Sequence, residues 1–340
     1  MRRFFKRPTV ALFKLAIALC AAEILLRGLI HLHLVPYPQF DENKVIHRYA
    51  ESLSLVYEMK ENGVGFDGDV EVRTNSIGNK DLEYAMEKPQ GVYRMAVLGD
   101  SVAFGLGVRT EDLFSKQLER TLNAGSFDRP KYDRVEILNF SVIGYNSWQE
   151  EIVLREKVLR TNPDVAIVGY CMNDDTRTDG IDPLAKQMHP KALGSRLHSR
   201  LINLSMHSFE RLTYSIFTNS DGAESLFNSL KNAQAQFNVL PILLIFPYRF
   251  DDLATYQEIS KHRGIRALAE SKGIRVLDFI DYTKQLSPED RAKLYRNVND
   301  RTHFSKAGMQ ALAGWLFERR DTLLNRSVVA IAPLALASVL

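Results

Sequence analysis

A serine at the end of an apolar run and a distant aspartate–histidine pair could together perform nucleophilic catalysis. The run from Tyr93 ends in Gly99-Asp-Ser101, and the motif Asp300-Arg-Thr-His303 comes near the end of the chain. A serine hydroxyl is a poor nucleophile until a base takes its proton, and the base works best when a carboxylate fixes its tautomer. We therefore expect Ser101 to be the nucleophile, His303 its base and Asp300 the residue that orients the base.

Short apolar runs alternate with amphipathic stretches from Tyr93 onward. Runs of strand length cover Met95–Leu98, Val135–Leu138, Val165–Tyr170, Val239–Phe246 and Ile274–Phe279. Helical spacing of apolar residues marks the intervening stretches Leu113–Leu122, Trp148–Leu159 and Leu253–Ala269. Apolar strands that alternate with helices indicate a parallel sheet covered on both faces. The predicted fold class is α/β, a flavodoxin-like doubly wound parallel sheet of about five strands.

Polar residues that could do chemistry follow these predicted strands. Ser101 follows the first strand, Asn139–Gly144 the second and Asn173 the third, while Asp300 and His303 lie beyond the fifth. Ligands of an open parallel sheet bind beyond the carboxyl ends of its strands. We therefore expect these segments to meet at one edge of the sheet, although they are far apart in the chain.

These ordered blocks resemble those of the SGNH hydrolases, also called the GDSL esterase and lipase family. The resemblance covers roughly residues 70 to 320 and implies catalytic roles for Ser101, Asp300 and His303. It also implies an oxyanion hole formed by the backbone amides of Ser101 and Gly144 and by the side-chain amide of Asn173. Such donors stabilise the negative charge that develops on a carbonyl oxygen under attack.

The resemblance implies a serine esterase or deacylase that works through an acyl-enzyme on Ser101. The expected substrate is an acylated carbohydrate or lipid outside the cytoplasm. One alternative is an O-acyltransferase, which would use the same triad with a sugar hydroxyl as acceptor. A second alternative is a catalytically inactive binding protein, which the intact serine, aspartate, histidine and asparagine disfavour.

Composition and the remaining motifs exclude other classes of function. The net charge is +3, from 44 basic and 41 acidic residues, so no basic face indicates a nucleic-acid partner. Gly105-Leu-Gly107 lacks the ending of a phosphate-binding loop. The acidic run from Asp175 has Arg177 and Lys186 where a calcium loop needs oxygen ligands. We therefore expect no cofactor and no metal.

The other histidines follow no zinc spacing, so we expect them to be surface or packing residues. They are His31, His33, His47, His189, His198, His207 and His262.

The amino terminus has the pattern of a membrane anchor. Basic residues in 1–9 precede an apolar stretch over 10–35, which is longer than the roughly 20 residues that cross a bilayer. This predicts a cytoplasmic segment, a single-pass transmembrane helix and a catalytic domain on the extracytoplasmic, periplasmic side. A signal peptide cleaved near Cys20–Ala22 and a helix lying on the membrane are alternatives. The stretch includes Lys14 and the pair Glu23 and Arg27.

The rest of the chain divides into predicted regions. Residues 36–92 resemble a lead-in or linker with short strands, one of them at Val70–Thr74. The hydrolase domain is expected over 93–325, with an insertion over 181–219 that could shape a substrate cleft. The apolar tail 326–340 has no predicted role. The expected partners are an acylated small molecule or glycan and, through the amino-terminal helix, a membrane.

Overall fold

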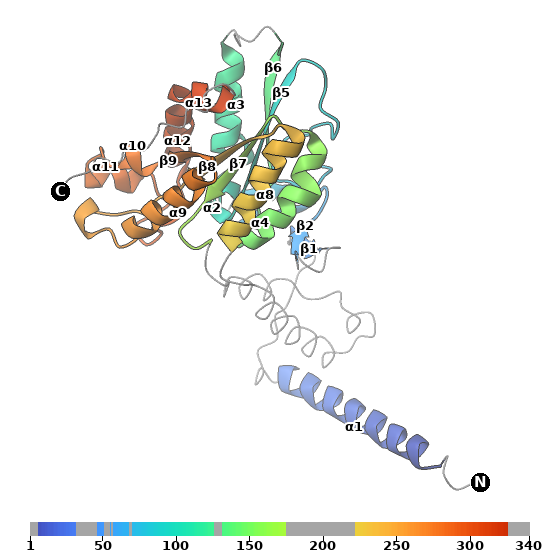
Figure 1. The fold of residues 1–340 in the computed structure, drawn as a ribbon. Helices are drawn as coiled ribbons and strands as arrows, with labels where there is room; N and C mark the ends of the chain where they lie inside the picture. The colour runs from blue at the N-terminus through green and yellow to red at the C-terminus, as the bar shows by residue number, and fades with distance from the viewer. Residues whose placement is uncertain are drawn as a thin grey trace, which may run out of the picture.

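The computed structural model describes residues 6–31, 46–50, 55, 57–67, 70–125, 131–174 and 222–325 (Figure 1). The predicted insertion 181–219, the tail 326–340 and the acidic run from Asp175 lie outside these residues.

A parallel sheet of five strands forms the centre of the α/β domain. The strands are β5 (Val92–Gly99), β6 (Arg134–Asn139), β7 (Val165–Tyr170), β8 (Leu240–Ile245) and β9 (Arg275–Asp278). Each overlaps one predicted strand, and their order across the sheet is β6-β5-β7-β8-β9. Numbered along the chain, this order is 2-1-3-4-5, which is the flavodoxin-like arrangement. The predicted parallel sheet is therefore confirmed.

Successive residues of each strand face opposite sides of the sheet, and both sides are buried. Met95 and Val97 pack into one apolar cluster, whereas Ala96 and Leu98 pack into the other. A strand that is buried on both faces needs apolar residues at every position. This requirement explains why the strands read as continuous apolar runs.

Helices cover both faces of the sheet (Figure 1). Apolar residues of α3 (Phe114–Ala124) and α12 (Lys306–Glu318) pack on one face. Those of α4 (Ser147–Val153), α8 (Gly222–Phe237) and α9 (Ile259–Ser271) pack on the other.

The helix predicted over Trp148–Leu159 begins as α4 and continues as a π-helical turn, η2 (Leu154–Val158). Shorter elements include α2 (Ser101–Phe104), η1 (Thr110–Asp112), η3 (Leu159–Thr161), η4 (Leu253–Thr255), α10 (Ile280–Thr283), α11 (Pro288–Lys293) and α13 (Arg320–Leu324).

The described part of the predicted lead-in packs against the domain. It forms two antiparallel pairs, β1 (His47–Tyr49) with β2 (Tyr57–Met59), and β3 (Val64–Asp67) with β4 (Val70–Arg73). Tyr57 lies in the same apolar cluster as the residues of α4 and α8. Its hydroxyl donates to the Ile143 carbonyl at 2.8 Å. This segment therefore supports a loop of the predicted site, which goes beyond the role of a linker.

The predicted transmembrane anchor over 10–35 needs a correction. The chain forms helix α1 (Lys6–His31) there, and the helix contains Lys14 and the ion pair between Arg27 and Glu23, with Nε to Oε1 at 2.8 Å. In the part of the chain that the structure describes, no helix is both long and apolar enough to cross a membrane. The transmembrane part of the prediction is therefore not borne out.

Candidate active site

Ser101 lies at the turn between the central strand β5 and the short helix α2. The Asp100 carboxylate caps this helix by accepting from the Val102 amide at 2.8 Å. The turn also packs closely against the neighbouring strand, because a Cβ atom at Gly99 would lie 2.7 Å from the Gly169 carbonyl oxygen and from Ala103 Cβ. Only glycine fits there, and its presence sets Ser101 at the carboxyl edge of the sheet.

The structure brings Ser101, His303 and Asp300 together in one hydrogen-bonded series. Ser101 Oγ lies 2.8 Å from His303 Nε2, and His303 Nδ1 lies 3.0 Å from Asp300 Oδ2. An ionised carboxylate only accepts hydrogen bonds, so Nδ1 carries the proton and Nε2 accepts from the Ser101 hydroxyl. This is the geometry that a serine nucleophile, a general base and an orienting carboxylate require.

Asp300 is held as an anion by groups of its own loop. Burial raises its pKa, but the His303 backbone amide, the His303 charge and the Thr302 amide together lower the pKa below its ordinary value. These amides donate to Oδ1 at 2.9 Å from His303 and 3.1 Å from Thr302. The carboxylate is therefore both charged and fixed in position next to Nδ1 of the imidazole.

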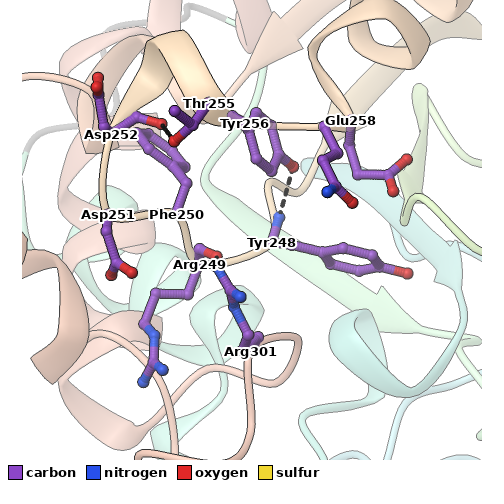
Figure 2. Close-up of a pocket in the computed structure, with 10 residues that line it drawn as sticks. Tyr248, Arg249, Phe250, Asp251, Asp252, Thr255, Tyr256, Glu258 and Arg301 are labelled. Carbon is purple, nitrogen blue, oxygen red and sulfur yellow. Dashed lines mark hydrogen bonds between the residues drawn. The ribbon is translucent and has the colours of Figure 1, made fainter.

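The loop that carries Asp300 and His303 is tied to the segment after β8 by Arg249 and Arg301, which we call the arginine clasp. Both arginines are labelled in Figure 2. The Arg249 amide donates to the Arg301 carbonyl at 2.7 Å. In return, Arg301 Nη2 donates to the Arg249 carbonyl at 2.8 Å. Arg249 Nη2 also donates to the Val298 carbonyl at 2.7 Å. The sequence motif contained Arg301, but nothing in it indicated this contact.

Asn173 follows β7 and lies between two side chains of the site. Its Nδ2 donates to Asp100 Oδ2 at 3.4 Å, and its Oδ1 accepts from the Tyr248 hydroxyl at 3.3 Å. Burial raises the pKa of Tyr248, so this phenol keeps its proton and acts as a donor. The contact fixes the amide with its nitrogen toward the Asp100–Ser101 turn. Tyr248 had not been identified from the sequence, although it too follows the carboxyl end of a strand.

Gly144 lies in a tight turn after β6. The Tyr145 amide donates to the Val142 carbonyl at 3.2 Å, and Gly144 has a φ of +77°. A turn with positive φ at its third position favours glycine. The Val142 amide donates to the Gly99 carbonyl at 3.0 Å, which attaches this turn to β5 just before Ser101. The structure therefore places the turn beside the strand end that carries the nucleophile candidate.

A second histidine–carboxylate pair lies beneath the segment after β8. His262 Nδ1 is 2.9 Å from Asp278 Oδ2, and His262 Nε2 is 3.1 Å from the Tyr256 hydroxyl. This hydroxyl also accepts from the Tyr248 amide at 3.0 Å. His262 is thus a packing histidine, as expected, but its partners had not been predicted.

The Cys171 thiol does not indicate further chemistry. Burial raises the pKa of the Cys171 thiol well above its ordinary value, so it stays protonated and unreactive. Within the described ranges, no group of three or more histidine, cysteine, aspartate or glutamate side chains is placed to hold a metal.

Comparison with known proteins identifies the family. A sequence model of the GDSL-like Lipase/Acylhydrolase family matches residues 97–311. The lipase/acylhydrolase from Enterococcus faecalis is 15% identical, and the alignment covers 67% of this chain and 95% of that chain with a TM-score of 0.41. The acetylxylan esterase Axe2 from Geobacillus stearothermophilus is also 15% identical, with 68% and 94% covered and a TM-score of 0.41.

The search of curated proteins found no match. Because the family match spans more than half of the chain, the protein belongs to the GDSL-like lipase and acylhydrolase family and is a hydrolase of ester bonds.

Proposed function

We propose that this protein is a serine esterase that removes an acyl group through an acyl-enzyme on Ser101. The observation that carries the proposal is the series of hydrogen bonds from Ser101 Oγ through His303 to Asp300, with distances of 2.8 and 3.0 Å. The His303 and Asp300 side chains are 20% and 16% exposed, so the series reaches solvent and is open to a substrate.

In the first half of the reaction, Ser101 Oγ attacks the ester carbonyl carbon and its proton passes to His303 Nε2. Collapse of the tetrahedral intermediate breaks the bond between the carbonyl carbon and the alcohol oxygen. The alcohol leaves with the proton from His303, and the acyl group stays on Ser101. Asp300 stabilises the imidazolium while it exists.

In the second half, water attacks the acyl carbon and gives a proton to His303 Nε2. The bond to Ser101 Oγ breaks, and the serine oxygen takes that proton back as the acid product leaves. The proposed oxyanion donors are the Ser101 and Gly144 amides and Asn173 Nδ2. A donor of this kind lowers the barrier by about 2.7–4 kcal/mol.

Hydrolysis of p-nitrophenyl acetate tests the proposal. We expect Ser101→Ala to lower kcat/KM by at least about 10⁴-fold, because it removes the hydroxyl that lies 2.8 Å from His303 Nε2. The control is Ser271→Ala, which changes an exposed serine at the end of α9. Mass spectrometry after treatment with a phosphonate ester should find the adduct on the peptide that contains Ser101. Full activity of Ser101→Ala, or an adduct elsewhere, would refute the assignment.

Two expectations from the sequence stay predictions. Acyl transfer would use the same residues, and a transfer product formed when a sugar acceptor is added would distinguish it from hydrolysis.

Location outside the cytoplasm is tested by a periplasmic reporter fused after residue 90, which should be active.

A further inference from the structure

A pocket of about 370 Å³ opens on the segment after β8 (Figure 2). Its wall is formed by residues 248–252 and 255–258, which follow β8, and by Arg301 from the loop of Asp300 and His303. The volume lies in the lower part of the range for small-molecule sites, about 300–1,000 Å³. This pocket has no part in the reaction steps described above.

Two wall residues connect the pocket to the reacting groups. Tyr248 lines it and donates to Asn173 Oδ1 at 3.3 Å. Arg301 lines it and lies between Asp300 and His303 in the same loop. His303 returns its proton to the leaving alcohol, so the alcohol part of an ester must lie on the side of this loop. The pocket shares this loop through Arg301, and this is the side on which we expect an alcohol subsite.

The charges of the wall are mixed. It carries the carboxylates of Asp251, Asp252 and Glu258 and the guanidinium groups of the arginine clasp. A sugar hydroxyl both donates and accepts hydrogen bonds, so a polyhydroxylated ligand can satisfy groups of both signs. An alkyl chain would strip water from these charges without replacing its hydrogen bonds, which is unfavourable. The wall thus favours a carbohydrate over a lipid.

Aromatic and amide groups complete a surface that suits a sugar ring. Figure 2 shows the Tyr248 ring extending along the pocket below Tyr256 and Glu258. An aromatic face offers flat apolar contact for the C–H face of a pyranose. Gln257 adds an exposed amide that can both donate and accept.

Buried polar groups hold this wall in shape. Arg291 is 4% exposed and donates from Nη1 to the carbonyls of Phe250 at 2.7 Å and Asp251 at 3.0 Å. The Tyr256 hydroxyl fixes the Tyr248 amide and is itself held by His262. A wall that is ordered before binding loses less conformational entropy when a ligand enters.

We propose that the pocket binds the glycosyl part of an O-acylated carbohydrate, with the acyl carbon at Ser101. This inference rests on the proposed esterase function and chooses the carbohydrate among its possible substrate classes. We expect Asp251 and Gln257 to determine the specificity of this pocket. Both residues line it, and neither belongs to the hydrogen-bonded series of Ser101, His303 and Asp300.

The test compares three esters: an O-acetylated methyl xyloside, p-nitrophenyl acetate and glycerol tributyrate. We expect Asp251→Asn with Gln257→Ala to lower the ratio of kcat/KM for the xyloside to kcat/KM for p-nitrophenyl acetate about tenfold, mainly through KM. Glu270→Gln, at the far end of α9 from Glu258, is the matched control and should leave this ratio unchanged.

Each outcome separates the inference from the function on which it rests. An unchanged ratio in the double variant, or wild-type preference for tributyrate over the xyloside, would overturn the carbohydrate subsite while the esterase stands. Absence of wild-type activity on all three esters would instead overturn the esterase function. Circular dichroism of the double variant should match wild type, because both changed side chains are exposed.

Discussion

The pairs His303–Asp300 and His262–Asp278 have almost the same geometry and opposite surroundings. Their Nδ1 to Oδ2 distances are 3.0 and 2.9 Å. The first pair is partly exposed and its Nε2 meets Ser101 Oγ, whereas the second is 2% exposed at both residues and its Nε2 meets the Tyr256 hydroxyl.

The two pairs differ in the group that meets the histidine Nε2 and in how far the pair is exposed to solvent. We infer that these two features, and not the histidine–aspartate pair itself, decide the role of each pair. In the proposed reaction, Ser101 Oγ gives its proton to His303 as it attacks a substrate that reaches the open edge. Burial raises the pKa of Tyr256, so its phenol keeps its proton and only holds the Tyr248 amide. In the proposed function one pair moves a proton, whereas the other holds the segment after β8 through Tyr256.

Replacing each histidine with glutamine tests most directly whether the two pairs have different roles. We expect His303→Gln to lower kcat/KM on p-nitrophenyl acetate by at least about 10⁴-fold with little loss of stability. His262→Gln should instead lower the free energy of unfolding by about 1–3 kcal/mol, because it perturbs the buried hydrogen bonds to Asp278 and to the Tyr256 hydroxyl. Esterase assays and urea unfolding measure the two effects. A catalytic loss in His262→Gln equal to that in His303→Gln, at full folding, would contradict the division of roles.

The carboxylates give a second, smaller contrast. Asp300→Asn should reduce kcat by about 10³–10⁴-fold, because the amide favours the wrong imidazole tautomer. Asp278→Asn should destabilise the fold by about 1–3 kcal/mol, because it perturbs buried hydrogen bonds to His262 and the Ile280 amide. If Asp278→Asn abolished activity in a protein that unfolds like wild type, the second pair would have a chemical role.

Variants of the arginine clasp test whether activity depends on the position of the loop that carries His303 and Asp300. Arg301→Met removes the hydrogen bonds from Nε and Nη2 to the Arg249 carbonyl, so we expect kcat on p-nitrophenyl acetate to fall about tenfold. Arg301→Lys should recover part of this loss. The free energy of unfolding should change by less than about 1 kcal/mol. Equal losses in the Lys and Met variants would argue against positioning through this carbonyl.

The smallest effect concerns stability in acid. The pKa of Asp300 is lowered in the folded protein, so the unfolded state binds more protons as the pH falls below about 3.9. The stabilisation from Asp300 is therefore present above that pH and is lost as the pH falls through its folded-state pKa. Urea unfolding should show a difference between wild type and Asp300→Asn at pH 7 that shrinks at pH 3. A difference that grows at pH 3 would contradict the direction of the shift.

The sequence predicts the sheet well because its strands are buried on both faces. Val165–Tyr170 coincides with β7, since six apolar or small residues in a row have few other stable environments. The helices α8 and α12 were not identified, and the fold alone shows where they pack. The lead-in looked like a linker because its strands are three or four residues long, and its contacts with the domain come from scattered side chains such as Tyr57.

The sequence alone determined the candidate triad, because Ser101, Asp300 and His303 lie in short motifs whose chemistry depends on residue type and local spacing. It also determined that these motifs follow strand ends, since the end of each continuous apolar run marks where a strand stops. Only the tertiary structure decided that Arg249 contacts the loop of His303, that Tyr248 orients Asn173, and that His262 lies between Asp278 and the Tyr256 hydroxyl. Those contacts join segments far apart in the chain, and their geometry depends on how the helices pack against the sheet.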